Sequence, residues 1–286
     1  MGTAQLAGDY GITNYRGFSE NEESLSLLDH AFSKGINIID TASRYYNTYK
    51  IIEDCRGLTP QNISIVDKVA SNVVNDFASS KEFIHWPWLN KFIKEGGSLC
   101  LMLHDAREYL DSVVRKNLKN CRDNGLVSSI GISVYEMECL EDCLDIGGFD
   151  VLQIPLSLAD RRFTNNKIKK KLNNINIHVR SVFLQGLLLS LPKKLPSAFE
   201  AYKLCYNKYR LLAPQLEDRL SIAMASAYMD MDCSLVLGIE TRAQFDKIYT
   251  AYKSIDTISD SLIKDARDIW GNLGREITDP RLWKSK

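Results

Sequence analysis

The stretch Gly35-Ile-Asn-Ile-Ile-Asp-Thr-Ala-Ser-Arg-Tyr45 is the most informative segment of the sequence for the fold. Its isoleucines form a short apolar run without helical period, which is typical of a parallel strand buried on both faces. The run ends on Asp40, and Tyr45 follows in a loop of small and polar residues. Asp40 could simply cap the next helix or a turn. Because a buried carboxylate is costly unless it is paired, its interpretation depends on the strands that follow.

Two further apolar runs end in the same way. Residues 62–69 are expected to form a strand that ends on Lys68, and residues 99–103 a strand that runs into His104. The full set of expected strands is 2–5, 36–40, 62–69, 99–103, 129–133, 150–154, 175–183 and 234–238. Eight strands that alternate with helices predict a closed (β/α)8 TIM barrel. A doubly wound open sheet is disfavoured because no Gly-x-Gly-x-x-Gly follows the first strand.

Helical periodicity and stop signals fill the segments between these strands. The expected helices are 19–33 (capped by Ser19), 49–56, an irregular 77–95 broken by Pro87, 109–124, 137–144, 167–172, 198–210, 215–229 and 241–253. An extra C-terminal helix is expected at 258–270, before a polar tail that covers one barrel face. We therefore predict one α/β domain, residues 1–286.

Composition narrows the class of protein. The chain of 286 residues is 45% apolar and 25% charged, which fits a soluble barrel with a sizeable core. Lys plus Arg equals Asp plus Glu, 36 each, so no global field favours nucleic acid or an anionic membrane. No apolar stretch is long enough to span a bilayer, and no signal-peptide core opens the sequence. Seven scattered cysteines indicate reduced thiols and a cytoplasmic protein, and Cys139 and Cys143 lack partners for a metal site.

Asp40, Tyr45, Lys68 and His104 are the candidate catalytic residues. In a (β/α)8 barrel the active site lies at the carboxyl ends of the strands, where all four are expected. Each also has a structural explanation: Lys68 could emerge into solvent, His104 could be a core histidine and Tyr45 a packing aromatic. The chance that all four residues lie at one rim for purely structural reasons is much smaller than the chance for any one of them.

The four side chains also make chemical sense together. A phenol with an unperturbed pKa of ~10 is a poor acid at neutral pH. We expect the ammonium of Lys68 to lower the pKa of Tyr45, and Asp40 to pair with Lys68. His104 could orient a carbonyl oxygen or share the proton transfer. Such a site suits reduction of a carbonyl by hydride from a nicotinamide cofactor.

These motifs resemble the aldo-keto reductase family over nearly the whole chain. Gly-Ile-Asn-Ile-Ile-Asp-Thr-Ala-x-x-Tyr is similar to the family's most specific signature, and the family's catalytic Asp, Tyr, Lys and His fall on Asp40, Tyr45, Lys68 and His104. The segments 103–105, 130–133, 150–155 and 181–188 match further family segments. The compact loops, above all after the fourth strand, resemble members linked to sugar or polysaccharide metabolism.

The resemblance implies a binding site for the cofactor. Ser133 and Gln153 would hold the nicotinamide carboxamide, and Arg180 stands where many members stack an aromatic ring on the nicotinamide. The backbone from Ser181 through Phe183 and Leu184 to Gln185 would follow the pyrophosphate. The adenosine phosphate would be gripped by the segment 238–244, with Gly238, Thr241, Arg242 and Gln244 as the assigned residues; a helix N-terminus is a favourable anion site in any case.

The sequence also departs from the family pattern. Tyr46 replaces a glycine, Val134 an asparagine, and Lys247-Ile248 a Glu-Asn pair that usually reads the adenine. Glu240 places a negative charge near the expected 2′-phosphate, and Arg242 could compensate. The resemblance implies NADP(H) over NAD(H), and a small-molecule carbonyl substrate as the partner.

Several alternatives stay open. The barrel could be a cofactor-binding regulatory or interaction subunit, because fold does not determine function. It could also be a cofactor-free aldolase that uses Lys68 as a Schiff base. The segment His85-Trp-Pro-Trp88 could be a substrate lid or a packing motif, and His178 is interpreted as structural. The sequence does not predict the substrate or the oligomeric state.

Overall fold

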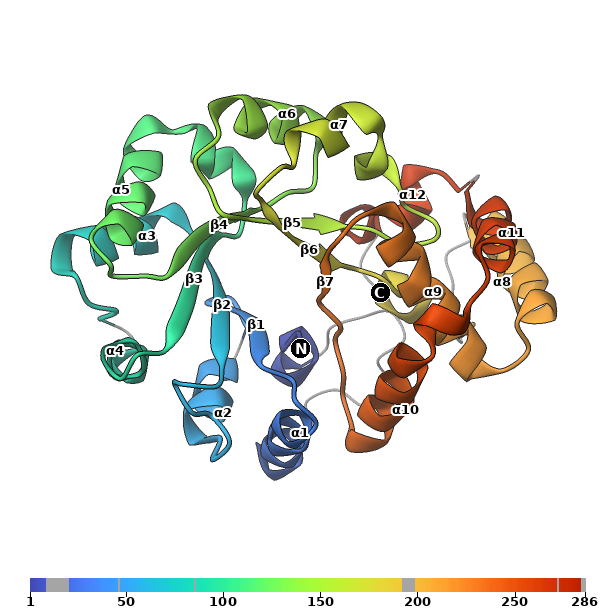
Figure 1. Ribbon diagram of the computed structural model, residues 1–286, viewed down its shortest axis with the longest axis horizontal. Coiled ribbons are helices and arrows are strands. Elements are labelled where there is room, and N and C mark those ends of the chain that lie inside the picture. The colour runs from blue at the N-terminus through green and yellow to red at the C-terminus, as the bar shows by residue number, and fades with distance from the viewer. Residues whose placement is uncertain (9–20, 46, 85, 192–198, 272, 284–286) are drawn as a thin grey trace.

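A computed structural model describes residues 1–8, 21–45, 47–84, 86–191, 199–271 and 273–283. Within these residues, seven parallel strands form one sheet in the order β1 to β7. The strands are β1 (Ile38–Ala42), β2 (Ser64–Val69), β3 (Ser98–Leu103), β4 (Ser129–Ser133), β5 (Val151–Pro155), β6 (Asn176–Arg180) and β7 (Ser234–Leu235). Figure 1 shows them side by side in a curved sheet with helices along its outer face. The predicted (β/α)8 architecture is confirmed.

The first predicted strand is the main difference in the sheet. Residues 2–5 were expected to be extended, but only Gly2 makes strand bridges, to Asp40 on one side and Gly238 on the other. The Gly2 amide donates to Leu237 O at 2.8 Å, so this residue stands in the eighth strand position between β1 and β7. The chain then turns into a 3-10 helix, Ala4–Ala7, because Leu6 N bonds back to Thr3 O at 3.0 Å.

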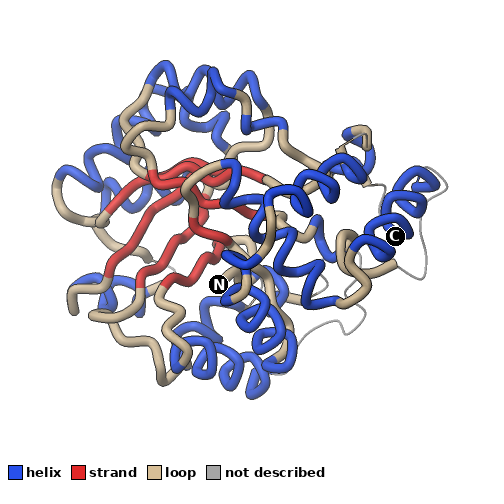
Figure 2. The backbone as a smooth tube through the Cα atoms, turned by 45° about the vertical axis from the view of Figure 1, so that its right-hand side comes forward, coloured by secondary structure: helices blue, strands red, loops and turns tan. Residues whose placement is uncertain are grey.

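The helices follow the predicted alternation. They are α1 (Asn21–Ser33), α2 (Thr48–Asp54), α3 (Ser71–Ser80), α4 (Pro87–Lys94), α5 (Ser112–Asp123), α6 (Met137–Ile146), α7 (Asn166–Lys171), α8 (Glu200–Leu212), α9 (Leu216–Asp230), α10 (Arg242–Lys253), α11 (Asp260–Trp270) and α12 (Arg275–Thr278). Figure 2 shows the strands enclosed by these helices. Ser19, the expected cap of the first helix, lies outside the described residues.

The segment between β2 and β3 differs from the prediction. One irregular helix broken at Pro87 was expected over residues 77–95, but two helices occupy the segment, and the first begins already at Ser71. Pro87 begins α4 instead of breaking a helix. The physical reason is that the first turn of a helix has no partner for its amides, so a proline is tolerated there.

The core lies on both faces of the sheet, as the apolar strands predict. A large cluster packs between the strands and the surrounding helices, while Val66, Cys100, Met102 and Val151 fill the barrel interior. His178 lines a cavity formed with the first residues of the strands, such as Ser64 and Ser98, at the amino ends of the barrel. That cavity is separate from the one described below.

The C-terminal segment folds back over the barrel. The predicted extra helix is α11, which packs against α8 and α9 and buries Trp270 completely. Beyond it, Asp279 is fully buried and accepts hydrogen bonds from Arg281 Nε at 2.9 Å and Arg275 Nη2 at 2.8 Å. These bonds hold the 3-10 helix Pro280–Leu282 beside the carboxyl ends of the strands.

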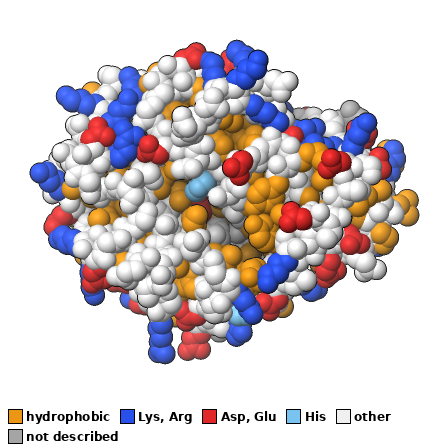
Figure 3. Space-filling view, viewed as in Figure 1, with side chains coloured by type: hydrophobic (Ala, Val, Ile, Leu, Met, Phe, Trp, Pro, Cys, Tyr) orange, Lys and Arg blue, Asp and Glu red, His pale blue; other side chains and the backbone are white. Residues whose placement is uncertain are grey.

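The molecular surface carries both signs of charge. On the face shown in Figure 3, Lys and Arg side chains are interspersed with Asp and Glu, and hydrophobic side chains gather near the centre. In the described part of the chain, none of the helices has the length and apolar character needed to cross a membrane.

Candidate active site

Three strands bring Asp40, Lys68 and Gln153 together inside the barrel. Asp40 Oδ1 accepts a hydrogen bond from the ammonium of Lys68, and Asp40 Oδ2 accepts one of 2.7 Å from Gln153 Nε2. The three residues are 4%, 2% and 0% exposed. The expected partner of the buried carboxylate is therefore Lys68, and the side-chain amide of Gln153 is a second one.

Tyr45 and His104 lie directly beside this group. Their rings meet edge to face with centroids 6.3 Å apart, and Lys68 Nζ lies 5.6 Å from the centre of the Tyr45 ring. The backbone amide of His104 donates to Val69 O at 2.9 Å, which anchors the residue at the end of β3. His104 Nδ1 is buried without a hydrogen-bond partner among the described residues. The structure thus gathers all four predicted catalytic side chains.

The electrostatics of Tyr45 differ from the sequence-based expectation. Lys68 was expected to lower the pKa of Tyr45, but burial raises this pKa well above its usual range, and the charge of Asp40 raises it further. Arg180 acts in the opposite direction. The reason for the difference is that the phenol is largely removed from water and shares the site with a carboxylate. Tyr45 is consequently protonated at neutral pH.

His104 is neutral at the same pH. Burial, together with the positive charges of Lys68, Arg44 and Arg180, lowers the pKa of His104 to about 4. A neutral imidazole can donate one hydrogen bond and accept another. It can therefore orient a carbonyl oxygen without adding charge to the site.

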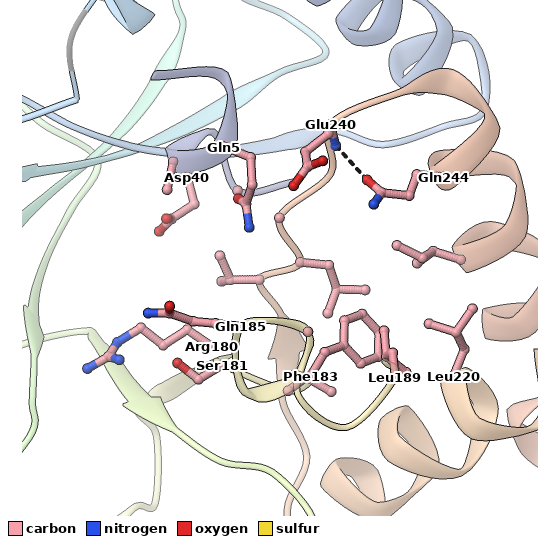
Figure 4. Close-up of a pocket in the computed structure, with 18 of the residues that line it drawn as sticks. Gln5, Asp40, Arg180, Ser181, Phe183, Gln185, Leu189, Leu220, Glu240 and Gln244 are labelled. Atoms are coloured by element: carbon pink, nitrogen blue, oxygen red, sulfur yellow. Dashed lines mark hydrogen bonds between the residues drawn. The ribbon is translucent and has the colours of Figure 1, made fainter. Parts of the chain in front are cut away.

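A cavity of about 350 Å³ opens from these four side chains. It runs from the catalytic group, past the turn after β6, to the beginning of α10. Figure 4 shows Asp40, Gln5 and Glu240 along one side and Arg180, Ser181 and Phe183 along the other. The predicted cofactor residues that line it are Ser133, Gln153, Arg180, Ser181, Phe183, Gln185, Gly238 and Gln244.

The nicotinamide end of the predicted site fits a carboxamide. Ser133 and Gln153 are paired in the register of β4 and β5, and both line the cavity. Gln153 Oε1 is buried and has no hydrogen-bond partner among the described residues, so an acceptor is present for an amide donor. Arg180 donates to Val134 O at 3.0 Å, and its guanidinium stacks 3.8 Å from the centre of the Tyr135 ring.

The turn after β6 has an unusual backbone. Ser181, Leu184 and Gln185 have φ of 61°, 46° and 52°, a conformation that non-glycine residues seldom adopt. Such strain persists only where surrounding structure enforces it, and it clusters at functional sites. Leu184 itself is buried in the core and does not line the cavity. The strained turn fits the expectation that its backbone, not its side chains, follows a pyrophosphate.

The far end of the cavity is formed by the beginning of α10. Thr241 caps this helix through Gln244 N at 3.1 Å, and Gln244 Oε1 accepts from Glu240 N at 2.8 Å. Neither Thr241 nor Arg242 lines the cavity. Arg242 instead approaches His30 Nδ1 of α1 at 3.3 Å, so the charged residue of this segment that faces the cavity is Glu240.

Gln5 and Tyr135 are among the cavity residues that the sequence did not predict. Gln5 contacts the backbone of Gly238 so closely that a Cβ there would lie 1.9 Å from Gln5 Oε1. Tyr135 lies between two guanidinium groups, Arg180 and Arg281, the latter 4.2 Å from the ring centre. Gln5 belongs to the expected strand 2–5, whose end is a 3-10 helix in the structure, and Tyr135 depends on a contact 146 positions away. Neither pattern is visible in the sequence.

The segment around Trp86 packs against α2. Trp86 stacks on Tyr49 with centroids 4.6 Å apart, and neither Trp86 nor Trp88 lines the main cavity. This arrangement favours the packing interpretation over a lid. Tyr46 and His85 lie outside the described residues.

A (β/α)8 barrel with Asp, Tyr, Lys and His side chains at its carboxyl rim is the architecture of a barrel oxidoreductase. The chain belongs to the aldo/keto reductase family, whose model matches residues 1–253. No curated protein matches it in sequence.

Several solved structures share the fold. The glycerol dehydrogenase AKR11B4 from Gluconobacter oxydans is 15% identical with a TM-score of 0.69, over 98% of this chain and 92% of that one. The holo form of the aldo-keto reductase AKR11C1 from Bacillus halodurans is 15% identical with a TM-score of 0.66, over 88% of both chains. Aldose reductase from Giardia lamblia is 15% identical with a TM-score of 0.62, over 93% and 94%. At such identities the likeness concerns the fold.

Proposed function

We propose that this protein is an NAD(P)H-dependent reductase that converts an aldehyde or ketone to an alcohol, with Tyr45 as the proton donor. The observation that carries the proposal is the packing of Tyr45 against His104 and Lys68. Both carboxylate oxygens of the nearby Asp40 accept hydrogen bonds, one from Lys68 and one from Gln153. Family membership supplies the reaction class.

Three parts of the cavity support the proposal of a bound nicotinamide nucleotide. Ser133 and Gln153 would hold the carboxamide, the strained turn Ser181–Gln185 would follow the pyrophosphate, and the segment 238–244 would receive the adenosine end. A bound nucleotide supplies the hydride for the carbonyl carbon. The resemblance to the family favours NADP(H) over NAD(H).

The protein's own residues handle the proton and the charge. The carbonyl oxygen gains negative charge as its carbon is reduced, and the hydroxyl of Tyr45 gives this oxygen a proton. The raised pKa of Tyr45 keeps the donor protonated beforehand. Lys68 and Arg180 then lie near the phenolate that remains, and their positive charges stabilise it. His104 donates or accepts as a neutral ring and orients the carbonyl.

The buried ion pair makes the aldolase alternative less suitable. A Schiff-base lysine attacks as a neutral, accessible amine. Lys68 is 2% exposed and its ammonium is bound to Asp40. The geometry thus favours a positioned cation over a nucleophile.

The test is to follow the absorbance of NADPH and of NADH with a panel of aldehydes and ketones. We expect oxidation of at least one nucleotide that requires both protein and carbonyl compound. Tight nucleotide binding without oxidation on any carbonyl would contradict the proposal and favour a cofactor-binding regulatory subunit. Borohydride trapping of a substrate on Lys68 would favour the aldolase.

A further inference from the structure

A second cavity of about 250 Å³ lies next to the catalytic group. It shares His104 and Tyr135 with the main cavity and none of its other lining residues. The shared rings place it beside the position where the substrate carbonyl meets Tyr45 and His104. A substrate whose carbonyl is held there can extend into this second cavity.

Three arginines line the second cavity, and two of them are already paired. Arg107 forms a bidentate ion pair with Asp105, with Nε 3.0 Å from both carboxylate oxygens. Arg281 bonds to Glu136 Oε1 at 2.5 Å and to Asp279 Oδ2 at 2.6 Å. The positive charges of these two guanidiniums are therefore already balanced by carboxylates.

Arg44 is the third arginine, and it forms neither an ion pair nor a side-chain hydrogen bond within the described part of the chain. It is exposed at the cavity and belongs to the loop between β1 and α2, immediately before Tyr45. Its positive charge lowers the pKa of both His104 and Asp105, so its field reaches the catalytic histidine. Asp105 and Glu136, the carboxylates that line this cavity, are engaged by the other two arginines.

We propose that Arg44 binds an anionic group of the substrate, so that the preferred substrates are carbonyl compounds that also carry a carboxylate or a phosphate. A guanidinium is suited to both because its planar donors match two oxygens at once. The inference rests on the proposed reductase function and deepens it. It assigns the second cavity as the subsite for the anionic group.

Matched substrate pairs test the proposal with the nucleotide-loaded protein. 4-Carboxybenzaldehyde is compared with its neutral methyl ester, and glyceraldehyde 3-phosphate with glyceraldehyde. For at least one pair, the anionic member should have a kcat/KM about tenfold higher, mainly through KM, as expected for one charged hydrogen-bonded contact at an exposed site. The preference should decline as salt is added. A response of the first pair identifies a carboxylate ligand, and a response of the second a phosphate ligand.

Variants separate Arg44 from general charge effects. Arg44→Gln should abolish the preference for the anionic member, and Arg44→Lys should restore part of it. Arg56→Gln removes the same charge from an exposed position after α2 that lines neither cavity, and it should keep the wild-type ratio. Equal rates within both pairs, or a preference that Arg44→Gln leaves intact, would overturn the inference while the reductase function stands. If neither the four compounds nor any member of the wider carbonyl panel is turned over, both the inference and the reductase function are overturned.

Discussion

The side-chain amide of Gln153 donates a 2.7 Å hydrogen bond to Asp40 Oδ2, and so ties β5 to β1 across the barrel interior. Lys68 occupies the other carboxylate oxygen, so the carboxylate has a partner on each side. A carboxylate fixed in this way positions the ammonium of Lys68 beside Tyr45. The arrangement at the catalytic rim therefore depends on a residue whose predicted role was cofactor binding.

Replacement of Gln153 by leucine should destabilise the protein. Asp40 Oδ2 would lose its partner while remaining buried, and an unsatisfied buried polar group costs about 1–3 kcal/mol. The measurement is urea unfolding at pH 7. Gln61→Leu, at an exposed position, is the control and should stay within about 0.5 kcal/mol of wild type. A Gln153→Leu protein as stable as wild type would show that this hydrogen bond contributes nothing.

The pH dependence of reduction should lack a transition near 6.5. Because the pKa of His104 is lowered from 6.5 to about 4, its ring is neutral throughout the range in which a free histidine titrates. The pKa of Tyr45 is raised, so the proton donor also stays protonated as the solution becomes mildly alkaline. We expect kcat/KM to be flat from about pH 6 to 9 and to fall only as the pH approaches 4. A transition near 6.5 that disappears in His104→Gln would contradict this picture.

Glu240 should weaken binding of NADPH relative to NADH. It lines the far end of the cavity, while Arg242 is directed to His30. NADPH carries an additional phosphate at its adenosine end, which a nearby carboxylate repels. Glu240→Gln should therefore raise the ratio of NADPH to NADH affinity by about threefold to tenfold. The readout is the dissociation constant of each nucleotide from its fluorescence. The control is Glu138→Gln, on the exposed side of α6, which should leave the ratio unchanged. If Glu240→Gln also leaves the ratio unchanged, Glu240 does not contact the adenosine end of the nucleotide.

Asp279 should be essential for docking of the C-terminal segment. It is fully buried and bonded to Arg275 and Arg281. Asp279→Ala leaves both guanidiniums without this partner, and because they are partly exposed we expect a loss of about 1–3 kcal/mol. Urea unfolding measures the loss, with Asp256→Ala at an exposed position as the control. Equal stability of the two variants would contradict a docking role.

Much of the fold follows from local patterns. Nearly continuous apolar runs identified strands such as β1 and β3, because strands buried on both faces require them, and β6 was identified by its alternation of apolar and polar residues. The catalytic candidates could be found because each follows or ends such a run. The strand at residues 2–5 could not be predicted in its true form, because a turn after Thr3 competes with sheet pairing and only the bonded neighbours decide between them. Pro87 was misinterpreted because the same residue can break a helix or begin one.

Long-range relationships account for the other differences. The hydrogen bond from Gln153 to Asp40 joins residues 113 positions apart, and the stack of Arg281 on Tyr135 joins the C-terminal segment to the catalytic rim. Neither has a local sequence signature. The raised pKa of Tyr45 was missed because the degree of burial outweighs the nearby ammonium, and burial is a property of the folded chain.

The central claim is that Tyr45 is the proton donor of a nicotinamide-dependent reductase. The most direct test compares wild type with Tyr45→Phe, which removes one hydroxyl and keeps the ring that packs against His104. Nucleotide binding is followed by fluorescence, and carbonyl reduction by absorbance, in the same preparations. We expect Tyr45→Phe to bind the nucleotide as wild type does and to lose at least about a hundredfold in kcat, the lower range of a general acid's contribution. Unchanged turnover in Tyr45→Phe would contradict the claim.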